Sequence, residues 1–93
     1  MFINGEWCDA AGGGTFEVTN PATGDKITDV PDGGQVDAAR AIAAAHDAFA
    51  GWAGLTAYDR SRILYKAWEL MSVRQADIAR IMTQEQGKPC VPP

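Results

Sequence analysis

Short apolar stretches separated by turn-forming residues occupy the first third of the chain. The apolar pair Phe2-Ile3 is followed by Asn4-Gly5 and then, after one acidic residue, by Trp7. Asn-Gly is the dipeptide that best tolerates the positive φ angles of a type I′ turn. The beginning of the chain therefore predicts a very short β-hairpin.

A second pair of strands is predicted further along. Apolar and polar side chains alternate over residues 16–19, and another strand-like stretch follows over residues 26–30. Between them, Pro21 disfavours helical backbone in the residue before it, and Gly24 tolerates a left-handed conformation, so the chain is expected to turn there. The pattern thus predicts a β-hairpin region over residues 1–34.

From residue 35 the apolar positions recur at the spacing of an α-helix. We expect a first helix over about residues 35–50, broken by the segment Gly51–Leu55. A second helix is expected to begin near Thr56, and a third follows a bend near residues 72–74. The apolar stripe of the second helix consists of Ile63, Leu64, Ala67, Leu70 and Met71.

The helical half ends in a strong stop signal. Gly87 tolerates the left-handed backbone that terminates a helix, Lys88 places a cation near the negative end of the helix dipole, and Pro89 prevents the helix from resuming. We expect a single partial domain over residues 1–93, made of a β-hairpin region (1–34), a helical region (35–89) and an extended tail (90–93).

The composition is that of an ordinary globular chain, with 46% hydrophobic and 22% charged residues among 93. The net charge is −4 and no Lys/Arg cluster is found, so neither nucleic acid nor a membrane is expected as a partner. No stretch approaches the roughly 20 apolar residues that span a bilayer, and the first residues do not resemble a targeting segment. We therefore expect a cytoplasmic location.

The best-known catalytic and metal-binding motifs do not occur. Cys8 and Cys90 lie at opposite ends without CxxC spacing, so both are interpreted as free thiols, with a disulfide between them left open. His46 is the single imidazole; a Cys–His pair would make a small thiol enzyme, whereas a lone His is more often a packing or surface residue. Core or interface packing, rather than ligand stacking, is the interpretation for Trp7, Trp52 and Trp68.

Several motifs occur in an order that resembles the N-terminal part of an aldehyde dehydrogenase, with most similarity to succinate-semialdehyde dehydrogenases. These motifs are Phe2–Trp7, Val18–Gly24, Val36–Ala39, the break at Trp52 and Glu85–Pro89. The resemblance implies an α+β fragment in which short β-hairpins precede about three helices, as the front part of a larger α/β subunit. It also implies oxidation of an aldehyde to a carboxylic acid with NAD or NADP as cofactor.

The same resemblance assigns the chemistry to segments beyond the matched region. The family's catalytic cysteine, general base and cofactor-binding turn have no counterpart here, so no catalytic and no cofactor-binding residue is expected, and the chain alone is predicted to be inactive. The implied partner is the remainder of the subunit. The alternative is a stand-alone interaction module that self-associates through its apolar helix faces and tryptophans.

One binding site is implied by position in the family. Many relatives hold a monovalent cation with backbone carbonyls after the first long strand and a carboxylate before the Gly-Lys-Pro run. The corresponding residues are Val18, Thr19 and Glu85, and oxygen ligands of this kind suit hard cations. The alternative is that Glu85 is simply an exposed residue in the last helical turn.

Overall fold

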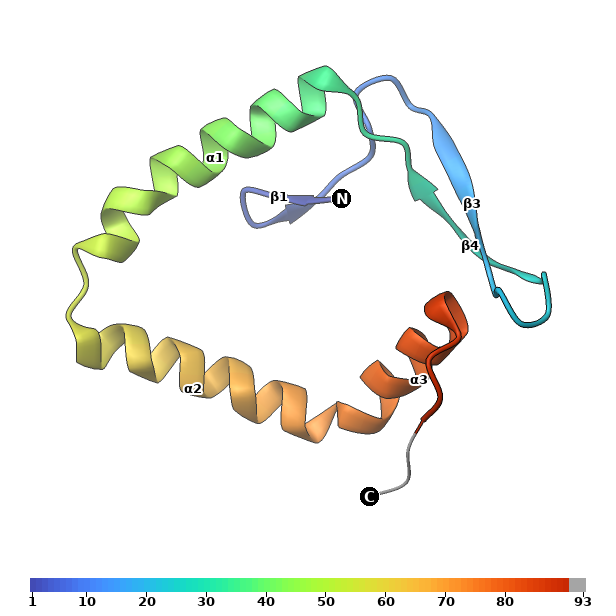
Figure 1. Cartoon of the computed structure of the whole chain (residues 1–93). Coiled ribbons are helices and arrows are strands. Elements are labelled where there is room, and N and C mark those ends of the chain that lie inside the picture. The colour runs from blue at the N-terminus through green and yellow to red at the C-terminus, as the bar shows by residue number, and fades with distance from the viewer. Residues whose placement is uncertain (91–93) are drawn as a thin grey trace. The chain divides into compact units, whose positions relative to one another are not determined.

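The computed structural model describes residues 1–90, which contain four short strands followed by three helices (Figure 1). In chain order these are β1 (Phe2–Ile3), β2 (Glu6–Trp7), β3 (Thr15–Thr19), β4 (Lys26–Pro31), α1 (Gln35–Ala53), α2 (Ala57–Val73) and α3 (Gln75–Gln86). This order confirms the predicted fold class. The expectation of an extended tail concerns residues 91–93 in large part, and these lie outside the described residues.

The β1–β2 hairpin forms as the sequence predicts. Phe2 pairs with Trp7 in antiparallel register, and the turn residues Asn4 and Gly5 have φ angles of 53° and 77°. Both angles are those that a type I′ turn requires. The paired rings of Phe2 and Trp7 lie 5.1 Å apart between centroids, at a separation where aromatic pairs attract. Ring contact and turn chemistry therefore select the same register.

The loop that joins β3 to β4 is held by hydrogen bonds within the loop itself. The backbone N–H of Asn20 donates to the Asp25 carbonyl at 2.8 Å, and the side-chain oxygen of Asn20 accepts from the backbone N–H of Ala22 at 2.9 Å. Gly24 has a φ of 76°, which glycine adopts without steric cost. The predicted turn around Pro21 and Gly24 is thus confirmed.

Helix α1 extends further than the sequence predicts. It continues through Gly51 to Ala53, and the chain leaves the helix at Gly54, whose N–H donates to the Ala50 carbonyl at 3.0 Å. The predicted end near residue 50 is therefore about three residues early, although the helix does end within the predicted break over residues 51–55. A glycine inside a helix costs only about 1 kcal/mol relative to alanine, which is too little to stop propagation between strong helix formers.

The end of the chain's helical half follows the prediction. Arg74 separates α2 from α3 with φ −98° and ψ 14°, at the expected bend. Gly87 adopts the left-handed conformation with φ 82°, and its N–H donates to the Thr83 carbonyl at 2.9 Å. Among residues 1–90, none of the helices is long and apolar enough to cross a bilayer.

By its internal contacts the chain divides into two units. One contains Met1–Phe16 and Asp29–Thr56, and the other contains Glu17–Thr28 with the chain from Ala57 onward. Within residues 1–90, only Ala10 and Asp37 are buried.

The apolar side chains of α2 do not form the core that their stripe predicts. No residue of α2 is buried, and Leu64 and Met71 each keep 60% of their surface exposed. Core packing of the tryptophans is likewise not found, because Trp7 is 84% and Trp68 is 58% exposed. Periodicity identifies the face that a helix will bury but not the surface that will cover it. Packing of these faces at an interface stays a prediction.

We expect Gly87→Ala to reduce the free energy of unfolding by about 1–2 kcal/mol, the cost of left-handed backbone for a residue with a Cβ. The added methyl group would also lie 3.4 Å from Pro21 Cγ. Gly12→Ala is the matched control, since Gly12 has ordinary φ and no atom within 4 Å of the new methyl group. Urea unfolding followed by circular dichroism measures both, and equal stabilities would contradict the cap assignment.

Candidate functional site

A buried carboxylate organises the first unit at the start of α1. Asp37 is only 4% exposed, and its Oδ1 and Oδ2 accept hydrogen bonds from the Ala11 amide (3.0 Å) and the Gly34 amide (3.1 Å). The Arg40 Nη2 atom lies 3.7 Å from Oδ1. Gly34 precedes the helix, so Asp37 satisfies an amide at the helix N-terminus and also ties the loop after β2 to α1.

The hydrogen bonds from Gly34 and Ala11 hold the pKa of Asp37 below its usual range, burial works in the opposite direction, and Arg40 lowers the pKa further. Asp37 is therefore ionised at neutral pH, and all of its contacts are structural. The sequence analysis gives this residue no role of its own within the motif Val36–Ala39. The available signal was the spacing of a carboxylate three residues after Gly34.

We expect Asp37→Asn to lower the unfolding temperature of the chain by roughly 5 °C or more, because the amide loses the charge and turns one acceptor into a donor. The folded pKa lies below the unfolded value of about 3.9, so the carboxylate stabilises the fold above about pH 4 and loses this effect as the pH falls further. Thermal scans at several pH values measure this. Asp47→Asn, at an exposed position of the same helix, is the control. An unchanged acid response in Asp37→Asn would contradict the assignment.

The two thiols have different partners, and neither partner is the imidazole. Cys8 Sγ accepts a hydrogen bond from Arg40 Nη2 at 3.3 Å, and Cys90 Sγ lies 3.0 Å from the Thr83 hydroxyl. Both cysteines are free, as predicted. His46 is exposed on α1. The structure thus gives no hydrogen-bonded Cys–His pair within residues 1–90, and the thiol-enzyme interpretation receives no support from these contacts.

The predicted cation ligands lie in the second unit, on two segments that meet. Val18 and Thr19 end strand β3, and Glu85 is exposed in the last turn of α3. A Cβ on Gly87 would lie 3.4 Å from Pro21 Cγ, so the turn after β3 contacts the end of α3. Val18 and Thr19 shortly precede Pro21 in the sequence, and Glu85 shortly precedes Gly87. The contact therefore brings together the two segments that carry the three predicted ligands.

Side-chain metal ligands do not gather in the described part of the chain. Within residues 1–90, no group of three or more His, Cys, Asp and Glu side chains is placed to hold a metal ion. A site at Val18, Thr19 and Glu85 would therefore depend on backbone oxygen atoms, as the hypothesis requires.

The glycine run at residues 12–14 does not have the geometry of a nucleotide-binding turn. It is followed by strand β3, whereas a phosphate-binding turn opens directly into a helix whose amides face the phosphate. A Cβ on Gly12 or Gly13 would meet nothing within 4 Å, so these glycines do not line a tight cradle. The residues of this run do not fit a dinucleotide.

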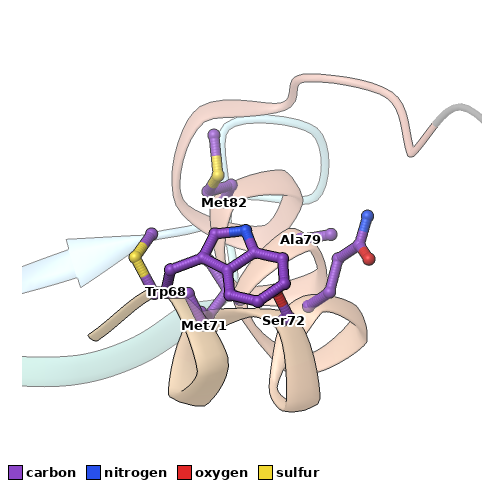
Figure 2. A pocket seen from close by; sticks show the side chains of 7 residues that line it. Trp68, Met71, Ser72, Ala79 and Met82 are labelled. Carbon is purple, nitrogen blue, oxygen red and sulfur yellow. The ribbon is translucent and has the colours of Figure 1, made fainter. Parts of the chain in front are cut away.

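An apolar hollow lies between α2 and α3, where the indole of Trp68 lies among the side chains of Met71, Ser72, Ala79 and Met82 (Figure 2). We call it the α2–α3 groove. Its volume is about 440 Å³, and it is lined by Trp68, Met71, Ser72, Gln75, Ile78, Ala79 and Met82.

Both the sequence pattern and the fold of this chain occur in known proteins. The sequence pattern of the aldehyde dehydrogenase family matches residues 7–91. The chain belongs to the aldehyde dehydrogenase family. This confirms the resemblance that the sequence motifs indicate.

Individual members of the aldehyde dehydrogenase family match nearly the whole chain. It is 53% identical over 88 residues to the glutarate-semialdehyde dehydrogenase of Pseudomonas putida, and 51% identical over 87 residues to the NADP-dependent succinate-semialdehyde dehydrogenase of Escherichia coli. The crystal structure of succinate-semialdehyde dehydrogenase from Burkholderia pseudomallei is 46% identical and matches 95% of the chain with a TM-score of 0.91.

The aldehyde dehydrogenase segment spans 18% of the length of these relatives. Its strands and helices match the N-terminal part of aldehyde dehydrogenase structures. The family uses NAD or NADP, and a relative that is 33% identical, with a TM-score of 0.89, was solved in complex with nicotinamide adenine dinucleotide.

Proposed function

We propose that this chain is the N-terminal scaffold of an NAD(P)-dependent dehydrogenase that oxidises a short aldehyde carrying an anionic group, such as succinate semialdehyde. The main support for this proposal is sequence identity. The chain is 53% identical to a relative named as a glutarate-semialdehyde dehydrogenase and 51% identical to one named as a succinate-semialdehyde dehydrogenase. A third relative, 49% identical, is named as a 3-sulfolactaldehyde dehydrogenase, whose substrate also carries a negative charge. The preference between these aldehydes would be set outside this chain.

In the overall reaction the aldehyde carbon transfers a hydride to the nicotinamide, water supplies the second oxygen, and a carboxylate and protons are released. None of these steps is assigned to a residue of this chain, because its glycine run does not fit the cofactor and its thiols have no hydrogen-bonded base. The contribution of the chain is structural. Asp37 fixes the start of α1, and Gly87 fixes the end of α3 against the turn at Pro21.

The test is a hybrid enzyme in which this chain replaces the matched 87 residues of the Escherichia coli relative. We expect the hybrid to oxidise succinate semialdehyde with kcat/KM within about tenfold of the parent enzyme, because a tenfold loss corresponds to only about 1.4 kcal/mol of transition-state stabilisation. A soluble, correctly sized hybrid without dehydrogenase activity would contradict the proposed function.

We further propose that Val18 and Thr19 carbonyls and the Glu85 carboxylate hold a monovalent cation where β3 meets the end of α3. The contact between Pro21 and Gly87 supports this, because it brings the segments that carry the ligands together. Crystals of the hybrid enzyme grown with rubidium are expected to show anomalous density beside Glu85, and Glu85→Gln is expected to remove it. Density for water alone in the unsubstituted hybrid would contradict the site.

The proposed compartment is the cytoplasm. Two unpaired thiols support it, since a reducing environment keeps cysteines in this state.

A further inference from the structure

The turn of the β1–β2 hairpin places a side-chain amide next to a glycine. Asn4 and Gly5 are both exposed, and a Cβ on Gly5 would meet no atom within 4 Å. The backbone nitrogen that follows an asparagine can attack the side-chain amide carbon of that asparagine, and a glycine crowds this nitrogen least because it has no side chain. The turn therefore carries an electrophile and a nucleophile at adjacent positions.

The backbone of Asn4 already has part of the conformation that this attack needs. Attack closes a five-membered ring, and such a ring fixes the ψ angle of the asparagine near the value found at the first central residue of a type II′ turn. That residue also has a positive φ, and among residues 1–90 Asn4 is the one non-glycine residue with a positive φ, at 53°. The observed type I′ turn becomes type II′ by rotation of the peptide group between Asn4 and Gly5.

The hairpin that closes this turn is small and exposed. Met1 and Cys8 exchange two backbone hydrogen bonds of 2.7 Å. Between that pair and the turn, the rings of Phe2 and Trp7 are in contact. Phe2 is 60% and Trp7 is 84% exposed, so closing the hairpin buries little apolar surface. A two-stranded hairpin of this kind opens at a small cost in free energy, and opening frees the turn peptide to rotate.

The chain has one other asparagine, and it lacks this reactivity. Asn20 is followed by Pro21, whose nitrogen carries no hydrogen and cannot act as the nucleophile. The side-chain oxygen of Asn20 also accepts a hydrogen bond from the backbone N–H of Ala22 at 2.9 Å. Asn20 is therefore an internal control for Asn4.

We propose that Asn4 is a site of spontaneous deamidation, an inference that does not depend on the proposed function. The Gly5 nitrogen loses its proton to solvent and forms a bond to Asn4 Cγ, and the side-chain nitrogen leaves as ammonia, which gives a cyclic imide. Water then opens the ring. Addition of water at Cγ gives aspartate, and addition at the backbone carbonyl carbon of Asn4 gives isoaspartate. Overall, one water is consumed and one ammonia is released, without an oxidant or reductant.

Both products change the surroundings of the turn. Asn4 lines a hollow between the hairpin and α1 together with Glu6, Arg40 and Asp47. A carboxylate at residue 4 adds a third acidic group beside a single guanidinium, so like charges repel there. Isoaspartate also inserts one carbon into the backbone, and the two-residue turn then no longer fits the pairing of Ile3 with Glu6. Deamidation is thus expected to loosen the hairpin from within its own turn.

The test incubates the folded 93-residue chain at neutral pH. Peptide mapping by mass spectrometry follows each amide, and an isoaspartyl methyltransferase labels the isoaspartyl product. We expect loss of the Asn4 amide with formation of isoaspartate, while the Asn20 amide stays intact. Asn4→Gly is the matched control, because Gly-Gly also forms a type I′ turn but has no side-chain amide. Equal methyl labelling of the unsubstituted chain and Asn4→Gly would overturn the proposal, as would deamidation that occurs only in urea.

Trp7→Ala tests whether opening of the hairpin controls the reaction. The substitution removes the ring contact with Phe2 at an exposed position. It is expected to accelerate loss of the Asn4 amide roughly two- to tenfold, because an aromatic pair shifts an opening equilibrium by about that factor. Phe2→Ala removes the same contact and carries the same expectation, and circular dichroism verifies that the helices of both variants remain folded. Rates equal to that of the unsubstituted chain in both variants would overturn the role of hairpin opening.

Discussion

The purified 93-residue chain is expected to form no detectable NADH or NADPH from succinate semialdehyde with either cofactor. Cys8 is hydrogen-bonded to a guanidinium and Cys90 lies beside a hydroxyl, so neither sulfur has a hydrogen-bonded base to activate it as a nucleophile. The glycine run at residues 12–14 leads into a strand and does not cradle a dinucleotide. Enzymes accelerate their reactions by at least about 10⁶-fold, so the hybrid enzyme should exceed the chain by that factor or more.

The isolated chain and the hybrid enzyme are assayed at the same protein concentration, and the formation of NADH or NADPH is followed by its absorbance. Cys8→Ser/Cys90→Ser in the isolated chain is the matched control, because residual activity from a contaminating enzyme would persist in it. Aldehyde-dependent reduction of the cofactor that disappears in this double variant would contradict the account. It would place the reaction within residues that we assign to the scaffold.

A single substitution in the groove is expected to have very different effects in the two settings. Met71→Glu should change the free energy of unfolding of the isolated chain by less than about 0.5 kcal/mol, as is usual for exposed positions. In the hybrid enzyme the same carboxylate would be buried without a partner, which should cost roughly 3 kcal/mol or more. We expect loss of most soluble, active hybrid enzyme, measured by gel filtration, specific activity and thermal unfolding.

Arg62→Glu is the matched control, since it places the same side chain on the same helix but outside the groove. It should leave the hybrid enzyme folded, because the proposed function requires only the apolar face of α2 to be covered. If Met71→Glu and Arg62→Glu have equal effects in the hybrid, net charge on α2 rather than burial in the groove decides stability. That result would contradict burial of the groove in the hybrid enzyme.

The turns and helix ends could be predicted from the sequence because their causes are local. Asn4-Gly5 specifies a type I′ turn by itself, and Gly87 specifies the end of α3 by its left-handed backbone. The end of α1 was predicted about three residues early, because a glycine such as Gly51 shifts helix propensity by only about 1 kcal/mol and the residues around it decide. Neighbouring helix formers easily outweigh a propensity of this size. The left-handed backbone at Gly87, with a φ of 82°, cannot continue an α-helix, so it ends the helix whatever its neighbours are.

The role of Asp37 could not be foreseen because its hydrogen-bond partner Ala11 lies 26 residues away along the chain. The sequence does show that Asp37 lies three residues after Gly34, at the start of α1. The contact with Ala11 depends instead on how the loop after β2 returns to α1, which the sequence does not show. The candidate cation ligands illustrate the same limit. Family resemblance selected Val18, Thr19 and Glu85, and only the structure shows that the turn at Pro21 contacts the end of α3.

The exposed face of α2 marks the largest gap between pattern and structure. Its apolar stripe predicts a buried face, but none of its residues is buried in the part of the chain that the structure describes. A chain of this size buries only about 60% of its unfolded surface even when compact, so it has little stability to spare. The proposed function accounts for this exposure, because the remainder of a subunit would cover the face.

The most direct test of that claim is amide hydrogen exchange along α2, compared between the isolated chain and the hybrid enzyme. We predict that the amides of residues 63–71 exchange readily in the isolated chain and become strongly protected in the hybrid, because docking would make their opening as costly as unfolding of the whole subunit. Equal protection of these amides in both proteins would contradict the conclusion that α2 depends on the remainder of an aldehyde dehydrogenase for its burial.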